Sequence, residues 1–225
     1  MAHRVRLVLD VPLSGTLNMA IDEMFLERQA KGSALPVLRI YFWKEPSWSV
    51  GYFQKAEKRN FPVVRRLTGG GAVLHDKDLT FSLIFPQPNP FFTGGVKGSY
   101  LAVNEALRAG LAPHFPGLDF ADCKTVPSGR AVGKDRVCFD SPSCHDLLLK
   151  GKKVVGASQR RVGGALLHQS TVFLNLEKDL LVDLICRGFE SKMNMIFEPV
   201  PLSEEELISA RKKESERYSS RDWAS

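Results

Sequence analysis

Four short segments combine residue types that can form covalent bonds, move protons or hold an anion. In residues 65–76, three consecutive glycines let backbone N–H groups approach a phosphate or a thioester carbonyl closely. Arg66 offers a fork of donors to an anion, and His75 offers a base or a hydrogen-bond donor. The glycines by themselves fit a tight turn between strands better. Because they are contiguous and no Gly-Lys-Ser/Thr follows, a P-loop and the dinucleotide-binding fingerprint are excluded.

Two further segments hold a candidate nucleophile and candidate ammonium groups. Cys138 opens the run Cys-Phe-Asp-Ser-Pro-Ser, and a neighbouring ammonium would lower its thiol pKa from about 8.5. Residues 150–159 place lysines on an expected hairpin. Because side chains alternate along a strand, Lys152 and Lys153 face opposite sides, so only one of them can enter a site. A lone cysteine is more often a small buried apolar residue, and a basic hairpin also fits a solvent-facing turn.

The fourth segment is an apolar strand over residues 166–174 that contains His168. A histidine at the edge of such a strand is more often hydrogen-bonded and structural than catalytic. None of the four segments is decisive when it is taken alone.

Helices are predicted where a capping residue precedes an apolar stripe with helical spacing. The stripe in 17–29 follows Ser14 and Thr16, and Ser203 with Glu206 forms a capping box that opens a final charged helix. Two further helices are expected over 99–111, with Ser99 as its cap, and over 179–189.

Strands are predicted where apolar and β-branched residues run between turn formers. Gly151 separates two short runs that read as a hairpin. The expected strands are 4–9, 37–43, 49–53, 63–67, 73–85 with a turn at 76–78, 146–150, 152–157 and 166–176. Strands and helices are grouped rather than strictly alternating, which predicts a single α+β domain over residues 1–225.

Composition narrows the class of protein. With 225 residues and 44% hydrophobic content, the chain can bury a core without metal or disulfide. Because Arg6 and Asp10 interrupt the N-terminal apolar run and no stretch approaches ~20 apolar residues, we expect neither a signal peptide nor a membrane helix. Its four cysteines include no C-x-x-C pair, and we interpret them as reduced thiols in a cytosol.

The net charge of +6 favours an acidic partner. A nucleic acid is not favoured, because the basic residues do not cluster with aromatic residues as they do in nucleic-acid-binding proteins.

The order of the segments along the chain is more informative than any one of them. Residues 65–76 match the pattern R-R-x-[ST]-G-G-[GR]-x-V-x-H-D at every specified position. Residues 151–156 match G-[RK]-K-[VI]-x-G, and residues 168–171 match part of a late [HQ]-H-G-[ST] strand. Over essentially its whole length, the chain resembles the lipoate–protein ligase and octanoyltransferase superfamily.

This resemblance implies a mixed β-sheet flanked by helices, similar to the catalytic domains of biotin and lipoate protein ligases. Its members attach octanoyl or lipoyl groups to one lysine of a lipoyl domain. Residues 138–143 match the C-F-[DE]-x-P-S of LipM-type octanoyltransferases, and the sequence stops soon after Trp223. We therefore expect a transferase consisting of one catalytic domain without a C-terminal accessory domain.

The resemblance also implies roles for individual residues. Cys138 would be the acyl-thioester nucleophile, and Lys153 would lower its pKa and orient the acyl carbonyl. His168 occupies the [HQ] position, whereas Gln169-Ser170 stands where relatives have His-Gly. The residues expected to bind substrate are Arg66, Thr68, Gly69, Gly70, Gly71, Ala72, Val73, Leu74, His75 and His168.

The expected partners are octanoyl acyl carrier protein as donor, and lipoyl domains of 2-oxoacid dehydrogenase complexes or glycine cleavage H protein as acceptors. A transferase needs no cofactor or metal, and the octanoyl or lipoyl group is its substrate. The first alternative is an ATP-dependent lipoate–protein ligase, which would use ATP and Mg²⁺. The second is a non-catalytic lipoyl-domain-binding protein. We expect a cytoplasmic enzyme without nucleic-acid or membrane partners.

Overall fold

The computed structural model describes residues 2–32, 35–57, 59–124, 139, 142–220 and 223. At its centre is a six-stranded mixed sheet in the order β10-β11-β6-β2-β1-β12. Strand β1 runs parallel to both of its neighbours, and the remaining pairs are antiparallel. The strands are β1 (His3–Leu9), β2 (Val37–Tyr41), β6 (Leu79–Pro86), β10 (Val155–Val162), β11 (Ala165–Val172) and β12 (Met195–Pro199).

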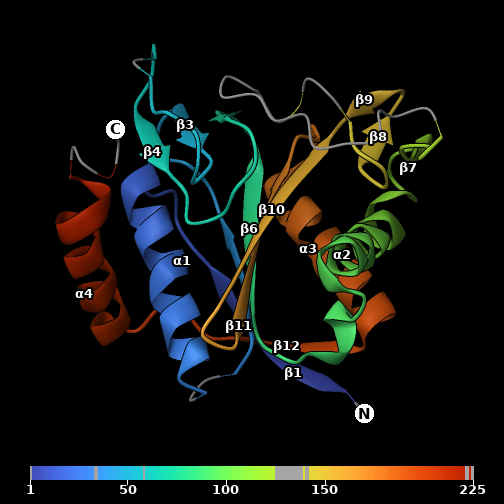
Figure 1. Cartoon of the computed structure of the whole chain (residues 1–225). Coiled ribbons are helices and arrows are strands. Elements are labelled where there is room, and N and C mark those ends of the chain that lie inside the picture. The colour runs from blue at the N-terminus through green and yellow to red at the C-terminus, as the bar shows by residue number, and fades with distance from the viewer. Residues whose placement is uncertain are drawn as a thin grey trace.

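Helices cover both faces of this sheet (Figure 1). One face packs against α1, with α4 on the outer side of α1, and the other face packs against α2 and α3. Because both faces are covered, all eight residues of β11 are buried. The helices are α1 (Gly15–Ala30), α2 (Gly95–Leu111), α3 (Lys178–Met193) and α4 (Glu204–Lys213), with short turns η1 (Pro90–Phe92) and η2 (Glu214–Tyr218).

Two three-stranded sheets lie at one end of the central sheet (Figure 1). The first has the order β4-β3-β5, and the second, in the order β7-β8-β9, contains the hairpin predicted around Gly151. Their strands are β3 (Ser47–Val50), β4 (Val63–Arg65), β5 (Val73–His75), β7 (Leu118–Phe120), β8 (Leu147–Leu149) and β9 (Lys152–Lys153). The predicted mixed sheet flanked by helices is thus confirmed.

The predicted capping residues Ser14 and Ser203 do precede helices α1 and α4. The Ser14 side chain accepts from the Leu17 N–H, and the Ser203–Glu206 capping box is complete. The prediction that Ser99 caps α2 was wrong. The helix begins at Gly95, and the Ser99 hydroxyl instead donates to backbone carbonyls of the preceding turn. A serine inside a helix can satisfy its hydroxyl in this way, so its presence does not mark the helix start.

The interpretation of all cysteines as reduced thiols was also wrong. Cys123 and Cys144 form a disulfide, whereas Cys186 is a free thiol. Strand β7 precedes Cys123 and strand β8 follows Cys144, and these strands pair antiparallel. The pairing therefore brings together two cysteines that are 21 residues apart in the sequence.

No helix in the described ranges has both the length and the apolar character needed to cross a membrane.

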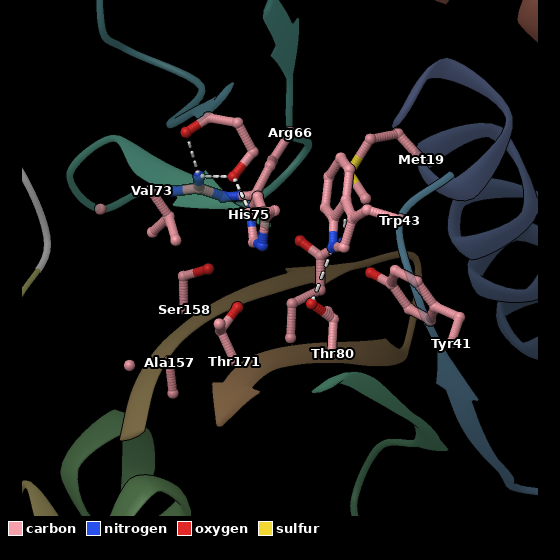
Figure 2. A pocket seen from close by; sticks show the side chains of 14 residues that line it. Met19, Tyr41, Trp43, Arg66, Val73, His75, Thr80, Ala157, Ser158 and Thr171 are labelled. Carbon is pink, nitrogen blue, oxygen red and sulfur yellow. Dashed lines mark hydrogen bonds between the residues drawn. The ribbon is translucent and has the colours of Figure 1, made fainter. Parts of the chain in front are cut away.

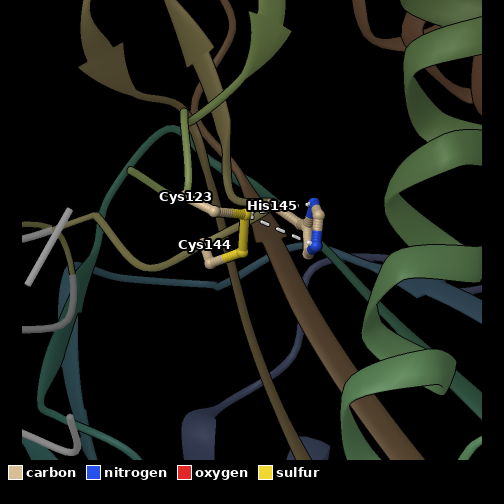
Figure 3. Close-up of side chains that lie close together, drawn as sticks. All are labelled: Cys123, Cys144 and His145. Atoms are coloured by element: carbon tan, nitrogen blue, oxygen red, sulfur yellow. Dashed lines mark hydrogen bonds between the residues drawn. A yellow bond between two sulfur atoms is a disulfide. The ribbon is translucent and has the colours of Figure 1, made fainter. Parts of the chain in front are cut away.

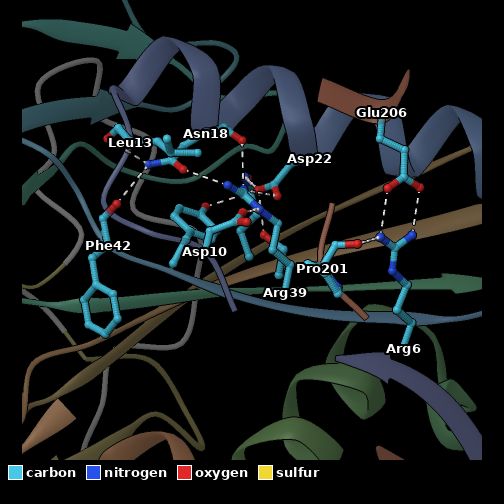
Figure 4. A network of polar contacts seen from close by, with 12 residues as sticks. Arg6, Asp10, Leu13, Asn18, Asp22, Arg39, Phe42, Pro201 and Glu206 are labelled. Atoms are coloured by element: carbon cyan, nitrogen blue, oxygen red, sulfur yellow. Dashed lines mark hydrogen bonds and ion pairs between the residues drawn. The ribbon is translucent and has the colours of Figure 1, made fainter. Parts of the chain in front are cut away.

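A buried arginine connects the central sheet to its first helix. The side chain of Arg39 on β2 is fully buried, and its Nε lies 2.6 Å from the Asp10 carboxylate. Its Nη1 lies 2.9 Å from the Asp22 carboxylate, and its Nη2 donates to the Asn18 side-chain oxygen (Figure 4). Burial opposes the charge, but Asp22 and Asp10 outweigh it and raise the pKa of Arg39 above its ordinary value.

Residues 65–76, called the glycine segment below, pack against the end of β3. A Cβ atom at Gly51 would lie 2.1 Å from the carbonyl oxygen of Gly70, so no side chain fits there. Gly70 itself has φ of 90°, in the left-handed region that favours glycine. Close backbone contact therefore explains Gly51, and the left-handed backbone conformation explains Gly70.

Replacing Arg39 by methionine should lower the free energy of unfolding by about 3–5 kcal/mol, because Asp22 and Asp10 would remain as uncompensated buried charges. Urea denaturation followed by circular dichroism measures this. Arg187→Met is the control, since the Arg187–Asp183 pair is exposed and worth about 0–1 kcal/mol. Equal losses in the two variants would contradict the structural role of Arg39.

Gly51→Ala should lower the free energy of unfolding by about 1–3 kcal/mol, because the added methyl group must displace the Gly70 backbone. The matched control is Gly69→Ala, where no heavy atom lies within 4 Å of the added Cβ. Thermal unfolding of both proteins tests the prediction. A Gly51→Ala protein as stable as Gly69→Ala would show that the two backbones are not in contact.

Candidate active site

A pocket opens between the central sheet and the β4-β3-β5 sheet (Figure 2). Its lining comes from seven strands or their ends and from α1, so segments far apart in the sequence meet there. The side chains with large apolar surfaces are Met19, Tyr41, Trp43 and Val73. These four side chains offer apolar contacts to an aliphatic chain. The polar residues of the lining are Ser49, Arg66, His75, Thr80, Ser158, Gln169 and Thr171.

The glycine segment supplies one wall of the pocket. Of the residues predicted there to bind substrate, Arg66, Gly70, Val73 and His75 line it. Thr68 lies behind the wall, where its hydroxyl accepts from Ser158 and donates to Gln169. The remaining predicted members of the segment, Gly69, Gly71, Ala72 and Leu74, are not in the lining.

Arg66 holds the glycine segment in place. Its Nη1 donates to the backbone carbonyl of Ser49 at 2.8 Å and to the Ser49 hydroxyl at 2.7 Å. Its Nη2 donates to the carbonyls of Gly69 and Gly71 at 3.0 and 2.9 Å. The guanidinium thus directs donors to the protein's own backbone, although the sequence pattern indicated an anion as its partner.

His75 is neutral and uses both ring nitrogens. Burial lowers its pKa below the ordinary value, although the Asp78 carboxylate opposes the shift. Its Nδ1–H donates to Asp78 at 2.8 Å, which leaves Nε2 to accept the Ser49 hydroxyl proton at 2.7 Å. In this arrangement His75 is a rigid part of the wall, because neither nitrogen is left to take a proton from a ligand.

The same hydrogen-bond chain continues to the opposite wall. Thr80 donates to Asp78 and accepts from the Trp43 indole N–H at 3.0 Å. The Trp43 ring also stacks on His75, with 3.9 Å between ring centroids (Figure 2). Trp43 therefore presents a fixed apolar face to the pocket.

Strand β11 contributes Gln169 to the pocket, whereas His168 is not in its lining. His168 faces the other side of the sheet, where its ring lies near Phe81 and Tyr100. Burial, followed by the charge of Arg161, lowers the pKa of His168 to about 3, so this histidine stays neutral at physiological pH. His168 and Gln169 point to opposite faces of the sheet because side chains alternate along a strand.

Gln169 connects the pocket to the buried charges beneath it. Its Nε2 donates to Asp22 at 2.7 Å, and its Oε1 accepts the Thr68 hydroxyl at 2.6 Å. Sequence reasoning missed Gln169 as a lining residue, and also Ser158 and Thr171. The alternation of strands β10 and β11 was the available signal, but it could be used only once their register was known.

The two lysines of β9 have different environments. Lys152 is exposed, whereas the side chain of Lys153 is 6% exposed. The Lys153 Nζ lies 2.7 Å from the Asp146 carboxylate and 5.7 Å from the centroid of the Phe139 ring. Cys138 lies outside the described residues. The two side chains thus differ in exposure, as alternation along the strand predicts, but Lys153 is not in the lining of the pocket.

Comparisons with known proteins agree with this architecture. Residues 14–214 match the family model described as the lipoyl protein ligase A/B catalytic domain. The octanoyltransferase LipM of Moorella thermoacetica is 39% identical over 72% of this chain and 62% of its own length. That of Halalkalibacterium halodurans is 37% identical over 87% of this chain and 79% of its own.

The fold is shared with solved structures. A lipoate protein ligase from T. acidophilum with bound lipoic acid superposes with a TM-score of 0.79 at 24% identity, over 100% of this chain and 99% of that one. At this identity the likeness concerns the fold alone. Since the family model covers most of the sequence and relatives of the same family exceed 30% identity, the chain belongs to the lipoyl protein ligase A/B catalytic domain family.

Proposed function

We propose that this protein is a cysteine-dependent octanoyltransferase of protein lipoylation, moving octanoyl groups from acyl carrier protein to a lysine of a lipoyl domain. The observation that carries this proposal is the similarity to octanoyltransferases LipM, at 28–39% identity. The run Cys138–Ser143, which resembles the nucleophile segment of that class, supports it.

Lys153 is the group that would activate the thiol. Its ammonium is nearly buried and lies close to the ring of Phe139, the residue that follows Cys138 in the sequence. A nearby positive charge stabilises a thiolate more than a thiol and so lowers the pKa of the thiol. Asp146 holds Lys153 in position through the ion pair between them.

The acyl chain would occupy the pocket. Trp43, Met19 and Val73 supply apolar contacts, and Gln169 takes the position at β11 that the sequence pattern gave to His168. Backbone N–H groups of residues 70–73 would stabilise the oxyanion, an interaction worth about 3 kcal/mol. In this proposal Arg66 and His75 shape the wall and do not transfer protons.

The reaction takes two steps. The Cys138 thiolate attacks the octanoyl thioester, a new thioester forms, and the carrier leaves as a thiolate that takes a proton from water. The neutral amine of the acceptor lysine then attacks this thioester, an amide forms as the amine gives a proton to water, and the Cys138 thiolate is released. Because a free lysine has a pKa of about 10.4, the acceptor must lose its proton on leaving water for the site. The net charge of +6 suits acidic carrier and lipoyl domains.

The ligase and the non-catalytic alternatives make different predictions. An ATP-dependent ligase would release pyrophosphate from ATP in the presence of Mg²⁺ and lipoate. A binding protein would retain the lipoyl domain without transferring an acyl group. The relatives from Moorella thermoacetica and Halalkalibacterium halodurans are octanoyltransferases, so they give the ligase alternative no support.

Incubation with octanoyl acyl carrier protein, without ATP, should add one octanoyl group to the protein in intact-mass analysis. Cys138→Ser should lose this adduct completely, because a serine hydroxyl is not ionised by a neighbouring ammonium. Cys186→Ser should keep it, since burial, with Glu190 and Asp183, raises the pKa of the Cys186 thiol to about 12. A full adduct on Cys138→Ser, or pyrophosphate release with lipoate and ATP, would refute the transferase mechanism.

Replacing Lys153 by methionine should raise the pKa of Cys138 and slow its alkylation by iodoacetamide at neutral pH about tenfold or more, a factor of ten for each pKa unit. The matched control is Lys152→Met on the adjacent exposed residue, which should leave the pH profile unchanged. Lys153→Arg should restore most of the rate because it keeps the charge. Identical profiles for Lys153→Met and Lys152→Met would exclude Lys153 as the activating group.

A further inference from the structure

Outside the pocket, two cysteines and a histidine bring three soft donor atoms together (Figure 3). The sulfur atoms of Cys123 and Cys144 and a ring nitrogen of His145 all lie within 4.8 Å of one another. The Cys123 sulfur is 3.6 Å from Nε2 and 3.8 Å from Nδ1 of His145. Both cysteines are exposed and His145 is half-buried, so an ion can reach the cluster from solvent.

The scaffold holds these three residues together independently of the disulfide. Strands β7 and β8 pair antiparallel, and the Ala121 N–H donates to the Asp146 carbonyl just beyond the paired residues. The Asn104 side chain on α2 donates to the His145 carbonyl at 2.9 Å. The His145 ring also contacts Phe120 edge to face, with 6.2 Å between centroids. Both segments therefore remain adjacent when the sulfur–sulfur bond is broken.

The distances fit a metal ion after that bond is broken. Zinc bonds of about 2.3 Å to sulfur and about 2.0–2.1 Å to nitrogen, at a tetrahedral angle, separate the two donor atoms by about 3.6 Å. The Cys123 sulfur already lies 3.6 Å from the Nε2 atom of His145. The two sulfurs would need to move apart to about 3.8 Å, which reduction permits.

We propose that reduction of the Cys123–Cys144 disulfide creates a Zn²⁺ site formed by these two thiolates and the His145 imidazole. A two-electron reductant breaks the sulfur–sulfur bond and leaves two thiols. A dithiol becomes a disulfide in this step, and a phosphine takes the oxygen of a water molecule and becomes a phosphine oxide, while the two protons of that water go to the sulfurs. Zn²⁺ then binds as the two thiol protons leave. Thiolate and imidazole ligands favour zinc over the hard cations Mg²⁺ and Ca²⁺, and three protein ligands leave the fourth position to water. This proposal does not depend on the acyl-transfer function.

The cluster adjoins the residues that hold Lys153. His145 directly precedes Asp146, whose carboxylate accepts from the Ser143 N–H at 2.6 Å and pairs with Lys153. An ion bound by Cys144 and His145 would thus restrain the chain on one side of this ion pair. The redox state of two exposed cysteines is thereby connected to the position of a buried ammonium.

The test measures zinc on the full chain, without an affinity tag, after desalting. Protein reduced with a phosphine should retain about one Zn²⁺ per chain, and protein with the disulfide intact should retain none. Cys144→Ser and His145→Asn should abolish retention. Asparagine is chosen because residue 145 has a φ of 67°, a left-handed conformation that asparagine tolerates. Cys186→Ser and Cys138→Ser are the matched controls and should retain the ion.

Co²⁺ provides a second readout, because thiolate ligands give intense charge-transfer absorption. This absorption should appear in the reduced protein and in both control variants, and it should be missing from Cys144→Ser. Circular dichroism verifies that each variant is folded. Equal zinc retention by oxidised and reduced protein, retention by Cys144→Ser, or loss in Cys138→Ser would overturn the assignment of these three ligands.

Discussion

The buried ion pair between Arg39 and Asp22 is the interaction on which the pocket depends. Two opposite charges in the interior are tolerable only when each is paired and hydrogen-bonded, and both conditions are met here. One Asp22 oxygen accepts from Arg39, and the other accepts from Tyr41, Ser82 and Gln169. The network therefore extends from helix α1 across strands β2, β6 and β11, and it ends at Gln169, which lines the pocket.

The pocket wall is built on a continuous chain of hydrogen bonds. The chain runs from Arg66 through Ser49 to His75 and Asp78, and it ends at Trp43. Groups held in this way need little reorganisation when a ligand enters. This arrangement gives the wall a fixed shape.

Around the β7-β8-β9 sheet, consecutive residues serve different purposes. Cys144 pairs with Cys123, His145 contributes a third soft donor atom, and Asp146 holds Lys153. Lys153 and Lys152 are neighbours, yet one is nearly buried and the other is exposed. In β9, the alternation of side chains along the strand separates the two lysines.

The sequence alone determined the features that depend on neighbours in the chain. Helix caps at Ser14 and Ser203, the hairpin around Gly151 and the motif of residues 65–76 were readable because short-range hydrogen bonds and backbone preferences act within a few residues. The motif order also led to the family and to the fold. Only the tertiary structure decided that Gln169 rather than His168 lines the pocket and that Cys123 meets Cys144, because both depend on the register between distant strands.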